Sequence, residues 1–232
     1  MPFAFWPAAP VVSQAWLDFL DFASVRADGT WLFRGHGDAA FDLIPAIGRQ
    51  PSAAAYRLAD EKTLFEDFVR EARRYFDADG FTKLEWLAVA QHHGLPTRLL
   101  DWSANPMVAA WLATEDESNS TDAEIVALRV PFVRRLRTAQ VFGPAGGAPV
   151  LVEVPPRAAR ITAQQGCFSL HPDPRLAWRP SPPVYDVAAF PVPASEKVDF
   201  RRLLHIFGYD PQRIHGDMDA LGKTLAWRYR QR

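Results

Sequence analysis

The sequence has little of several features that mark specialised protein classes. It holds one cysteine, Cys167, so no intramolecular disulfide can form and a reducing cytosol is the expected compartment. The formal net charge of −1 gives no bulk attraction to nucleic acid or to an anionic membrane. No uninterrupted apolar stretch approaches the length of a membrane span. The apolar first residues lack the basic start of a secretory signal, so we expect a cytoplasmic protein with no membrane partner.

The composition that remains is that of an ordinary globular protein. Hydrophobic residues make up 48% of the 232 residues and charged residues 23%. A chain of this length can bury one large core, and we predict a single domain over residues 1–232. Eight tryptophans and 20 prolines indicate an aromatic-rich core joined by many rigid turns.

Hydrophobic periodicity and turn signals predict helices alternating irregularly with short strands. The expected helices cover residues 12–25, 60–77, 82–93, 196–207 and 217–230, and one more begins at Asn105-Pro106. The expected strands cover residues 30–35, 99–102, 124–130, 149–154, 160–170 and 185–192. This mixture predicts an α+β fold, a single mixed domain with a small, mostly buried sheet surrounded by helices.

The first candidate site is the run from Trp31 to His36. Strand alternation places Leu32, Arg34 and His36 on one face of the strand. An arginine inside an apolar strand is costly unless a carboxylate or a phosphate receives its planar fork. Gly35 directly after it permits close approach of a backbone or a ligand. The residues leave two interpretations open: a structural Arg–carboxylate pair, or a grip for a ligand such as pyrophosphate.

The second candidate site is the run from Gln91 to Ser103, which is rich in polar groups. Asp101 follows two leucines and precedes a tryptophan, so we expect it to be partly buried beside Arg34 or Arg98. His92 and His93 fall in the last turn of a helix, where a cation suits the helix dipole. Adjacent helical histidines point in different directions, which suits a metal ion poorly, and we predict no metal.

The third candidate site runs from Arg160 to Phe168. Gln164 and Gln165 are amides inside an apolar strand, which pair with backbone or face a ligand. Cys167 could form a nucleophilic site with His93 and Asp101, but a free cysteine is more often a small buried apolar residue.

Together these residues resemble the hallmarks of the FRG-domain family. That family carries an aromatic-Arg-Gly triplet on a strand, here Phe33-Arg34-Gly35. Its central hallmark is similar to the run Gln91-His92-His93-Gly94-Leu95-Pro96-Thr97-Arg98-Leu99-Leu100-Asp101-Trp102-Ser103, followed by Asn105-Pro106 and an alanine-rich helix. A third element resembles Arg160-Ile161 followed by Gln165-Gly166 and Phe168. The resemblance covers residues 31–170 and implies one FRG domain that includes the C-terminal helices at 196–230.

The order of motifs is also similar to the Arg-Ser-Glu group of ADP-ribosyltransferases, which implies a related fold and NAD as substrate. By this resemblance Arg34 holds the NAD pyrophosphate, with Gly35 beside it, and Ser103 or Thr97 orients the nicotinamide ribose. His93 and Asp101 complete the implied cofactor-binding set.

The same resemblance asks for a catalytic glutamate that the third element lacks. Gln164 and Gln165 stand there instead, and a neutral amide cannot stabilise a ribosyl cation as a carboxylate does. Glu153, on a neighbouring expected strand, can replace it, and the sequence leaves Glu153, Gln164 and Gln165 open as the third catalytic residue. The catalytic set implied by the resemblance is therefore Ser103, Gln165 and Glu153.

Three functions follow as hypotheses. The first is an NAD-binding enzyme of ADP-ribosyltransferase or NAD-glycohydrolase type, acting on a protein or nucleic-acid acceptor, as a toxin or phage-defence effector with an antitoxin or immunity partner. The second is a non-catalytic binding module in which Arg34 and Asp101 form a structural ion pair. The third is a nucleic-acid-binding module that uses arginine clusters such as Arg134, Arg135 and Arg137.

Overall fold

The computed structural model describes residues 10–49, 56–75, 80–116, 120–130, 141–143, 147–154, 166–216 and 218–230. The α-helices are α1 (Gln14–Ser24), α2 (Leu58–Ala72), α3 (Lys83–His92), α4 (Pro106–Ala113), α6 (Lys197–Ile206), α7 (Pro211–His215) and α8 (Met218–Arg230). The strands are β1 (Trp31–His36), β2 (Leu99–Ser103), β3 (Ala123–Arg129), β4 (Val150–Val152), β5 (Gly166–Leu170) and β6 (Asp186–Val192). Short 3-10 helices, η1 (Ala46–Gly48) and η4 (Ala194–Glu196), lie in two of the connections.

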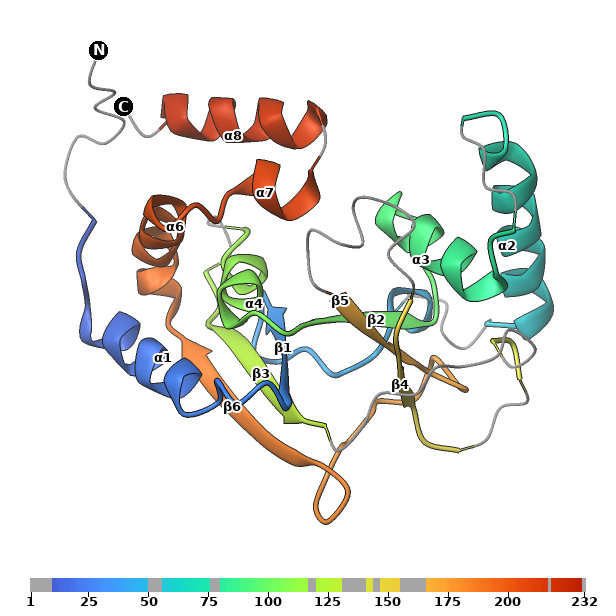
Figure 1. Ribbon diagram of the computed structural model, residues 1–232, viewed down its shortest axis with the longest axis horizontal. Coiled ribbons are helices and arrows are strands. Elements are labelled where there is room, and N and C mark those ends of the chain that lie inside the picture. The colour runs from blue at the N-terminus through green and yellow to red at the C-terminus, as the bar shows by residue number, and fades with distance from the viewer. Residues whose placement is uncertain are drawn as a thin grey trace.

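The strands form one antiparallel sheet of six, in the order β4-β5-β2-β1-β3-β6. Helices surround this sheet in Figure 1, with α1, α4 and α6 beside β1, β3 and β6, and with α2 and α3 at the other end. The fold is therefore α+β in a single-domain arrangement, and the prediction of fold class is confirmed.

Local signals in the sequence explain where the helices near the site begin. Thr82 caps α3 in a capping box: its side chain accepts from the Glu85 backbone N–H, and the Glu85 side chain accepts from the Thr82 N–H. Asn105 caps α4, and Pro106 occupies the first turn, where its missing N–H costs nothing. α3 therefore ends inside the Gln91–Ser103 motif and α4 starts just after it, so the two helices flank β2 in the chain.

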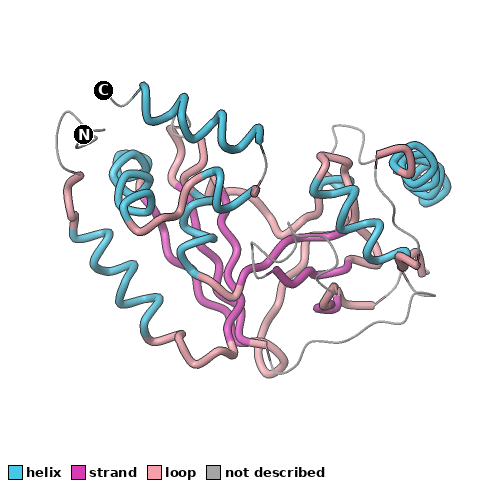
Figure 2. Tube along the Cα trace, turned by 45° about the horizontal axis from the view of Figure 1, so that its top comes forward, coloured by secondary structure: helices cyan, strands magenta, loops and turns pink. Residues whose placement is uncertain are grey.

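The core has separate apolar clusters on the two faces of the sheet. On one face, α1, α4 and α6 pack against β1, β3 and β6 around residues such as Trp16, Phe33 and Phe200. Farther along that face, α2 and α3 pack against β2, β4 and β5. On the opposite face, Leu43 and Trp178 from two loops cover the strands. Figure 2 shows the helices gathered around the strands, with loops along the remaining side.

The sheet forks between β1 and β2. β1 and β3 pair without interruption from Trp31↔Arg129 to His36↔Glu124, whereas the register of β1 with β2 is the single pair Phe33↔Ser103. Beyond that pair the strands diverge. In both Figure 1 and Figure 2, β2 and β5 turn away from the steeper strands β1, β3 and β6. Beyond Phe33↔Ser103, the backbones of β1 and β2 no longer pair with each other, and Arg34 is the first residue of β1 past that pair.

The predicted elements match the observed ones to within a few residues, with two exceptions. The short helix α7 was not predicted, although Asp210 caps it, Pro211 begins it and Gly216 ends it with a left-handed backbone (φ 69°). β5 begins at Gly166, and the predicted strand residues 160–165 lie outside the described part of the chain. Asp217, the first residue of the last predicted helix, also lies outside it.

Candidate functional site

Arg34 stands at the fork, and the fold engages only part of its guanidinium. Its Nε donates to Nε2 of His36 at 3.1 Å, and its Nη1 donates to the carbonyl oxygen of Asp101 at 2.7 Å. That carbonyl belongs to the stretch of β2 that has lost its pairing with β1. Within the described residues, no group is hydrogen-bonded to Nη2, and 13% of the side chain is exposed. One edge of the guanidinium therefore remains able to receive an anion.

The charge of Arg34 is set by opposing neighbours. Burial lowers its pKa to about 10, the carboxylate of Asp101 opposes this shift, and the positive charge of Arg49 adds to it. Arg49 follows η1, is exposed, and donates from Nε to the carbonyl of Ile44 at 2.5 Å. Arg34 stays protonated at neutral pH. Two guanidinium groups thus act on one carboxylate, which leaves local positive charge for a ligand.

Asp101 is a loose partner for Arg34. Its Oδ2 lies 4.0 Å from Nη1 of Arg34, and 42% of its side chain is exposed. Burial raises the pKa of the carboxyl group, against the opposing effects of Arg34, a hydrogen bond from Gln91, and Arg49. The closest link between Arg34 and Asp101 therefore runs through the main chain.

His36 holds the other side of the guanidinium. It is 4% exposed, and burial together with the charges of Arg34 and Arg49 lowers its pKa to about 3, opposed by the carbonyl of Phe41. The imidazole is therefore neutral, and because Nε2 accepts from Arg34 its proton sits on Nδ1. His36 was predicted on the face of Arg34 but not as a site residue. The signal for it was its position two residues along the same strand.

Gly35 serves the fold. A Cβ at this position would lie 2.0 Å from the carbonyl oxygen of Ala109 and 2.5 Å from the backbone nitrogen of Ala113. The close approach that Gly35 permits is thus to the backbone of α4, which fills the space beside β1 on that face.

Thr97 and Ser103 are also occupied by local structure. The Thr97 hydroxyl donates to Oε1 of Gln91 at 2.5 Å and accepts from the Leu99 N–H at 3.2 Å, which ties the end of α3 to β2. The Ser103 Oγ accepts from the Asn105 N–H at 3.0 Å, and Ser103 is 4% exposed. Its pairing with Phe33 puts Ser103 on the α4 face, whereas Arg34 extends from the other face of β1.

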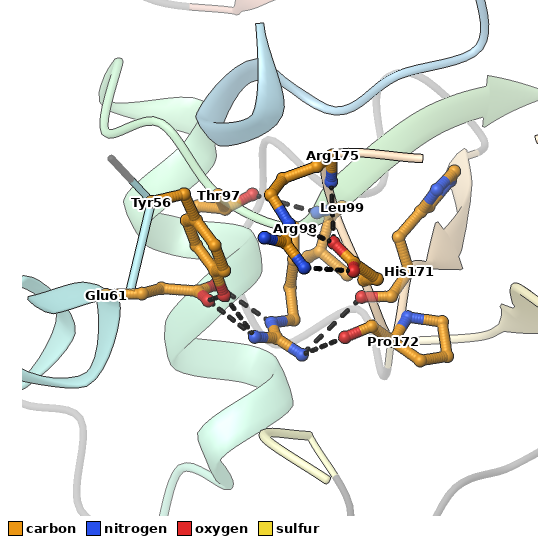
Figure 3. Close-up of polar contacts among 9 residues, drawn as sticks. Tyr56, Glu61, Thr97, Arg98, Leu99, His171, Pro172 and Arg175 are labelled. Carbon is orange, nitrogen blue, oxygen red and sulfur yellow. Dashed lines mark hydrogen bonds and ion pairs between the residues drawn. The ribbon is translucent and has the colours of Figure 1, made fainter. Parts of the chain in front are cut away.

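Arg98 does not pair with Asp101, and that part of the prediction is wrong. Its Nε donates to Oε1 of Glu61 at 2.8 Å and its Nη2 to Oε2 at 2.5 Å, in a bidentate pair whose side chains are 1% and 3% exposed (Figure 3). Nη2 also reaches the hydroxyl of Tyr56 at 3.0 Å, and that hydroxyl donates to Glu61. Nη1 faces the carbonyls of His171 and Pro172 at 3.5 and 3.4 Å. The motif arginine therefore joins α2, the start of β2 and the end of β5.

The triplet and the central run thus meet at one fork of the sheet, and both lie within the span that matches a protein-family model. The model of the FRG domain matches residues 29–122, which include β1, α3, β2 and α4. The chain contains an FRG domain. Searches of the curated proteins and of the solved structures found no match. The family match ends before the third element at residues 160–168, so that part of the resemblance stays a prediction.

The other predicted site residues make no hydrogen bond or ion pair with Arg34 within the described ranges. His93 is the exposed C-cap of α3, and its ring packs against that of His92 with 5.2 Å between centroids. Glu153 follows β4 at the edge of the sheet. Cys167 is buried, its thiol donates to the carbonyl of Val152 at 3.3 Å, and burial raises its pKa to about 12. A thiol held protonated in this way is a poor nucleophile.

Several predicted residues lie outside the described part of the chain. They are Arg134, Arg135, Arg137, Arg160, Ile161, Gln164 and Gln165. The roles proposed for them therefore remain predictions.

Three further features bear on ligands. Within the described ranges, no three His, Cys, Asp or Glu residues are grouped so that they could hold a metal ion. A groove of about 410 Å³ lies between α2 and α3, lined in part by Phe65, Val69, Phe81 and Trp86, and it shares no residue with the surroundings of Arg34. No described helix combines the length and the apolar character that crossing a bilayer requires.

Proposed function

We propose that this FRG-domain protein binds NAD through Arg34 and cleaves the bond to nicotinamide, as an enzyme of ADP-ribosyltransferase or NAD-glycohydrolase type. The observation that carries the proposal is the partly free guanidinium at the fork of the sheet. Nη2 of Arg34 has no hydrogen-bond partner among the described residues, and Arg49 adds a second positive charge nearby. The paired oxygens of a diphosphate can accept two parallel hydrogen bonds from a planar guanidinium, which a single charged atom cannot do.

His36 supports the same proposal because it orients the guanidinium without adding charge. A neutral imidazole that accepts from Nε fixes the plane of the guanidinium and leaves its full positive charge for the ligand. Asp101 is the internal competitor for that charge. Its distance of 4.0 Å and its exposure make it a weak one, so a diphosphate with two negative charges can displace the contact.

Binding of NAD and of ADP, measured by calorimetry, tests the proposal. Arg34→Lys keeps a positive charge and removes the planar fork, so we expect affinity to fall by about 10- to 100-fold, as for the loss of charged hydrogen bonds. Asp101→Asn should bind ADP as tightly as the wild type or more tightly, because the competing charge is gone. Arg129→Lys is the matched control, since Arg129 is a half-exposed strand arginine that contacts Asp28 and Asp186.

Release of nicotinamide, followed by chromatography with and without cell lysate, then separates binding from cleavage. The proposal fails if the wild type binds neither NAD nor ADP at millimolar concentration. It also fails if Arg34→Lys binds both as well as Arg129→Lys does.

A second function has its own support, the hydrogen bond from Nη1 of Arg34 to the Asp101 carbonyl. This bond joins β1 to β2 where their ladder has ended. In a non-catalytic binding module, the role of Arg34 would be to hold β1 and β2 together through this bond. Such a module would lose thermal stability in Arg34→Lys, and it would bind no NAD in any variant.

A further inference from the structure

The proposed cleavage needs a carboxylate near the ligand, and the residues expected from the sequence do not supply it. Glu153 follows β4, which is three strands away from β1 in the sheet order. At about 4.8 Å between neighbouring strands, that separation is roughly 14 Å. Gln165 is an amide and lies outside the described residues. A carboxylate on the strand next to Arg34 would be in a better position.

Glu124 is such a carboxylate. The ladder between β1 and β3 pairs Arg34 with Val126 and His36 with Glu124. Directly opposed residues of an antiparallel ladder point to the same face, so Glu124 shares the face of Arg34 and His36. Leu32 of β1 and Val126 of β3 belong to the same buried cluster as Trp178. This confirms that the side chains of Leu32 and Val126 lie on the same face of the sheet. A residue diagonal to Arg34 in this way lies about 7–8 Å from it.

The surroundings of Glu124 leave its carboxylate available. The residue is partly buried on β3, and among the described residues no hydrogen bond or ion pair engages its side chain. Burial alone raises the pKa of this carboxyl group. By contrast, Asp122, two residues earlier, uses its Oδ1 to accept from the backbone N–H of Ala194. A carboxylate that is partly desolvated and has no hydrogen-bond or ion-pair partner in the described part of the chain is a candidate functional group.

We propose that Glu124 is the catalytic carboxylate of the site, an inference that rests on NAD binding at Arg34. With the diphosphate on Arg34, the nicotinamide ribose extends along the sheet toward Glu124. The C1′–N bond breaks, and its electron pair leaves with nicotinamide as the neutral base. The carboxylate of Glu124 faces the cationic ribosyl centre. The oxygen of water, or an oxygen or nitrogen of a macromolecular acceptor, then bonds to C1′. Glu124 takes the proton that this nucleophile loses.

The proposed role separates catalysis from binding, and the experiment uses that separation. Glu124→Gln keeps the size of the side chain and removes its charge. We expect nicotinamide release at saturating NAD to fall at least 100-fold, while the dissociation constant for NAD stays within about threefold of the wild type. Glu124→Asp, which withdraws the carboxylate by one methylene, should retain an intermediate rate. Glu66→Gln, an exposed glutamate on α2, is the matched control and should behave as the wild type.

Glu153→Gln and Gln165→Ala are the rival variants, and each outcome decides something. Loss of turnover in Glu153→Gln with full turnover in Glu124→Gln would overturn the inference and leave NAD binding intact. So would a Glu124→Gln protein that loses only affinity, or a wild type that binds NAD and never releases nicotinamide. A wild type that binds no NAD removes the proposed function and this inference together. Thermal melting of Glu124→Gln, expected to match the wild type within a few degrees, excludes misfolding as the cause.

Discussion

The buried pair of Arg98 and Glu61 should dominate the mutational sensitivity of this domain. Both side chains are almost fully buried, and two parallel hydrogen bonds join them. Glu61→Gln leaves the guanidinium charged without its carboxylate. Removing one partner of a buried ion pair costs about 3–5 kcal/mol, because the remaining charge has lost both water and its counter-ion. For a domain of this size, that loss lowers the melting temperature by about 6–20 °C.

The expected loss in the free energy of unfolding depends on the burial of the ion pair, so an exposed ion pair close to Glu61 in the chain provides the control. Arg57 and Asp60 form an ion pair at 2.9 Å in the same part of the chain, but their side chains are 77% and 59% exposed. Asp60→Asn should cost less than about 1 kcal/mol. Urea unfolding followed by tryptophan fluorescence measures both variants against the wild type.

A double variant tests the reasoning from the other side. Replacing the pair by apolar residues, as in Arg98→Met with Glu61→Leu, should recover much of the loss, since neither charge is then left buried alone. The argument is refuted if Glu61→Gln lies within 1 kcal/mol of the wild type. It is also refuted if the double variant loses more stability than the sum of the losses in Arg98→Met and Glu61→Leu alone.

Two further predictions follow from other buried groups. The free energy of unfolding should fall as pH drops from about 6.5 toward 3, because His36 and His171, whose pKa is lowered to about 3, stay neutral in the folded state while unfolded imidazoles take up protons. His36→Gln and His171→Gln should each reduce the pH dependence of the free energy of unfolding by up to about 1.4 kcal/mol per pH unit. Urea unfolding between pH 7 and pH 5 measures this dependence, and an unchanged pH dependence in both variants would contradict the prediction. Gly35→Ala should cost more than about 2 kcal/mol in the same assay, since its Cβ meets the backbone of α4. Gly222→Ala in α8, with nothing within 4 Å, should be neutral or slightly stabilising, and equal losses in both variants would refute the packing argument.

Features set by neighbouring residues could be predicted from the sequence. The start of α4 at Asn105 and Pro106 and the end of α3 before Gly94 depend on contacts within a few residues. The alternation of β1 depends only on the geometry of a strand. α7 was missed because five residues are too few to show helical periodicity.

Features that depend on distant contacts could not be predicted. Glu61 lies 37 positions from Arg98, and helical periodicity marks it only as a polar residue of α2. The position of Glu124 beside His36 is a matter of strand register, which one sequence does not determine. The same limit explains why Asp101 was assigned two arginines: the sequence places three charged groups near each other without saying which reaches which.

The order of the strands has a practical consequence for expressing parts of this protein. The strands of the two arms are interleaved along the chain: β1, β3 and β6 form one arm, and β2, β4 and β5 form the other. A fragment limited to residues 29–122, the span of the family match, would hold β1 and β2 alone, joined by a single register pair. It would lack the outer neighbours β3 and β5 and would present bare strand edges that invite aggregation. The interleaved chain therefore makes the later strands part of any piece intended to keep Arg34 in place.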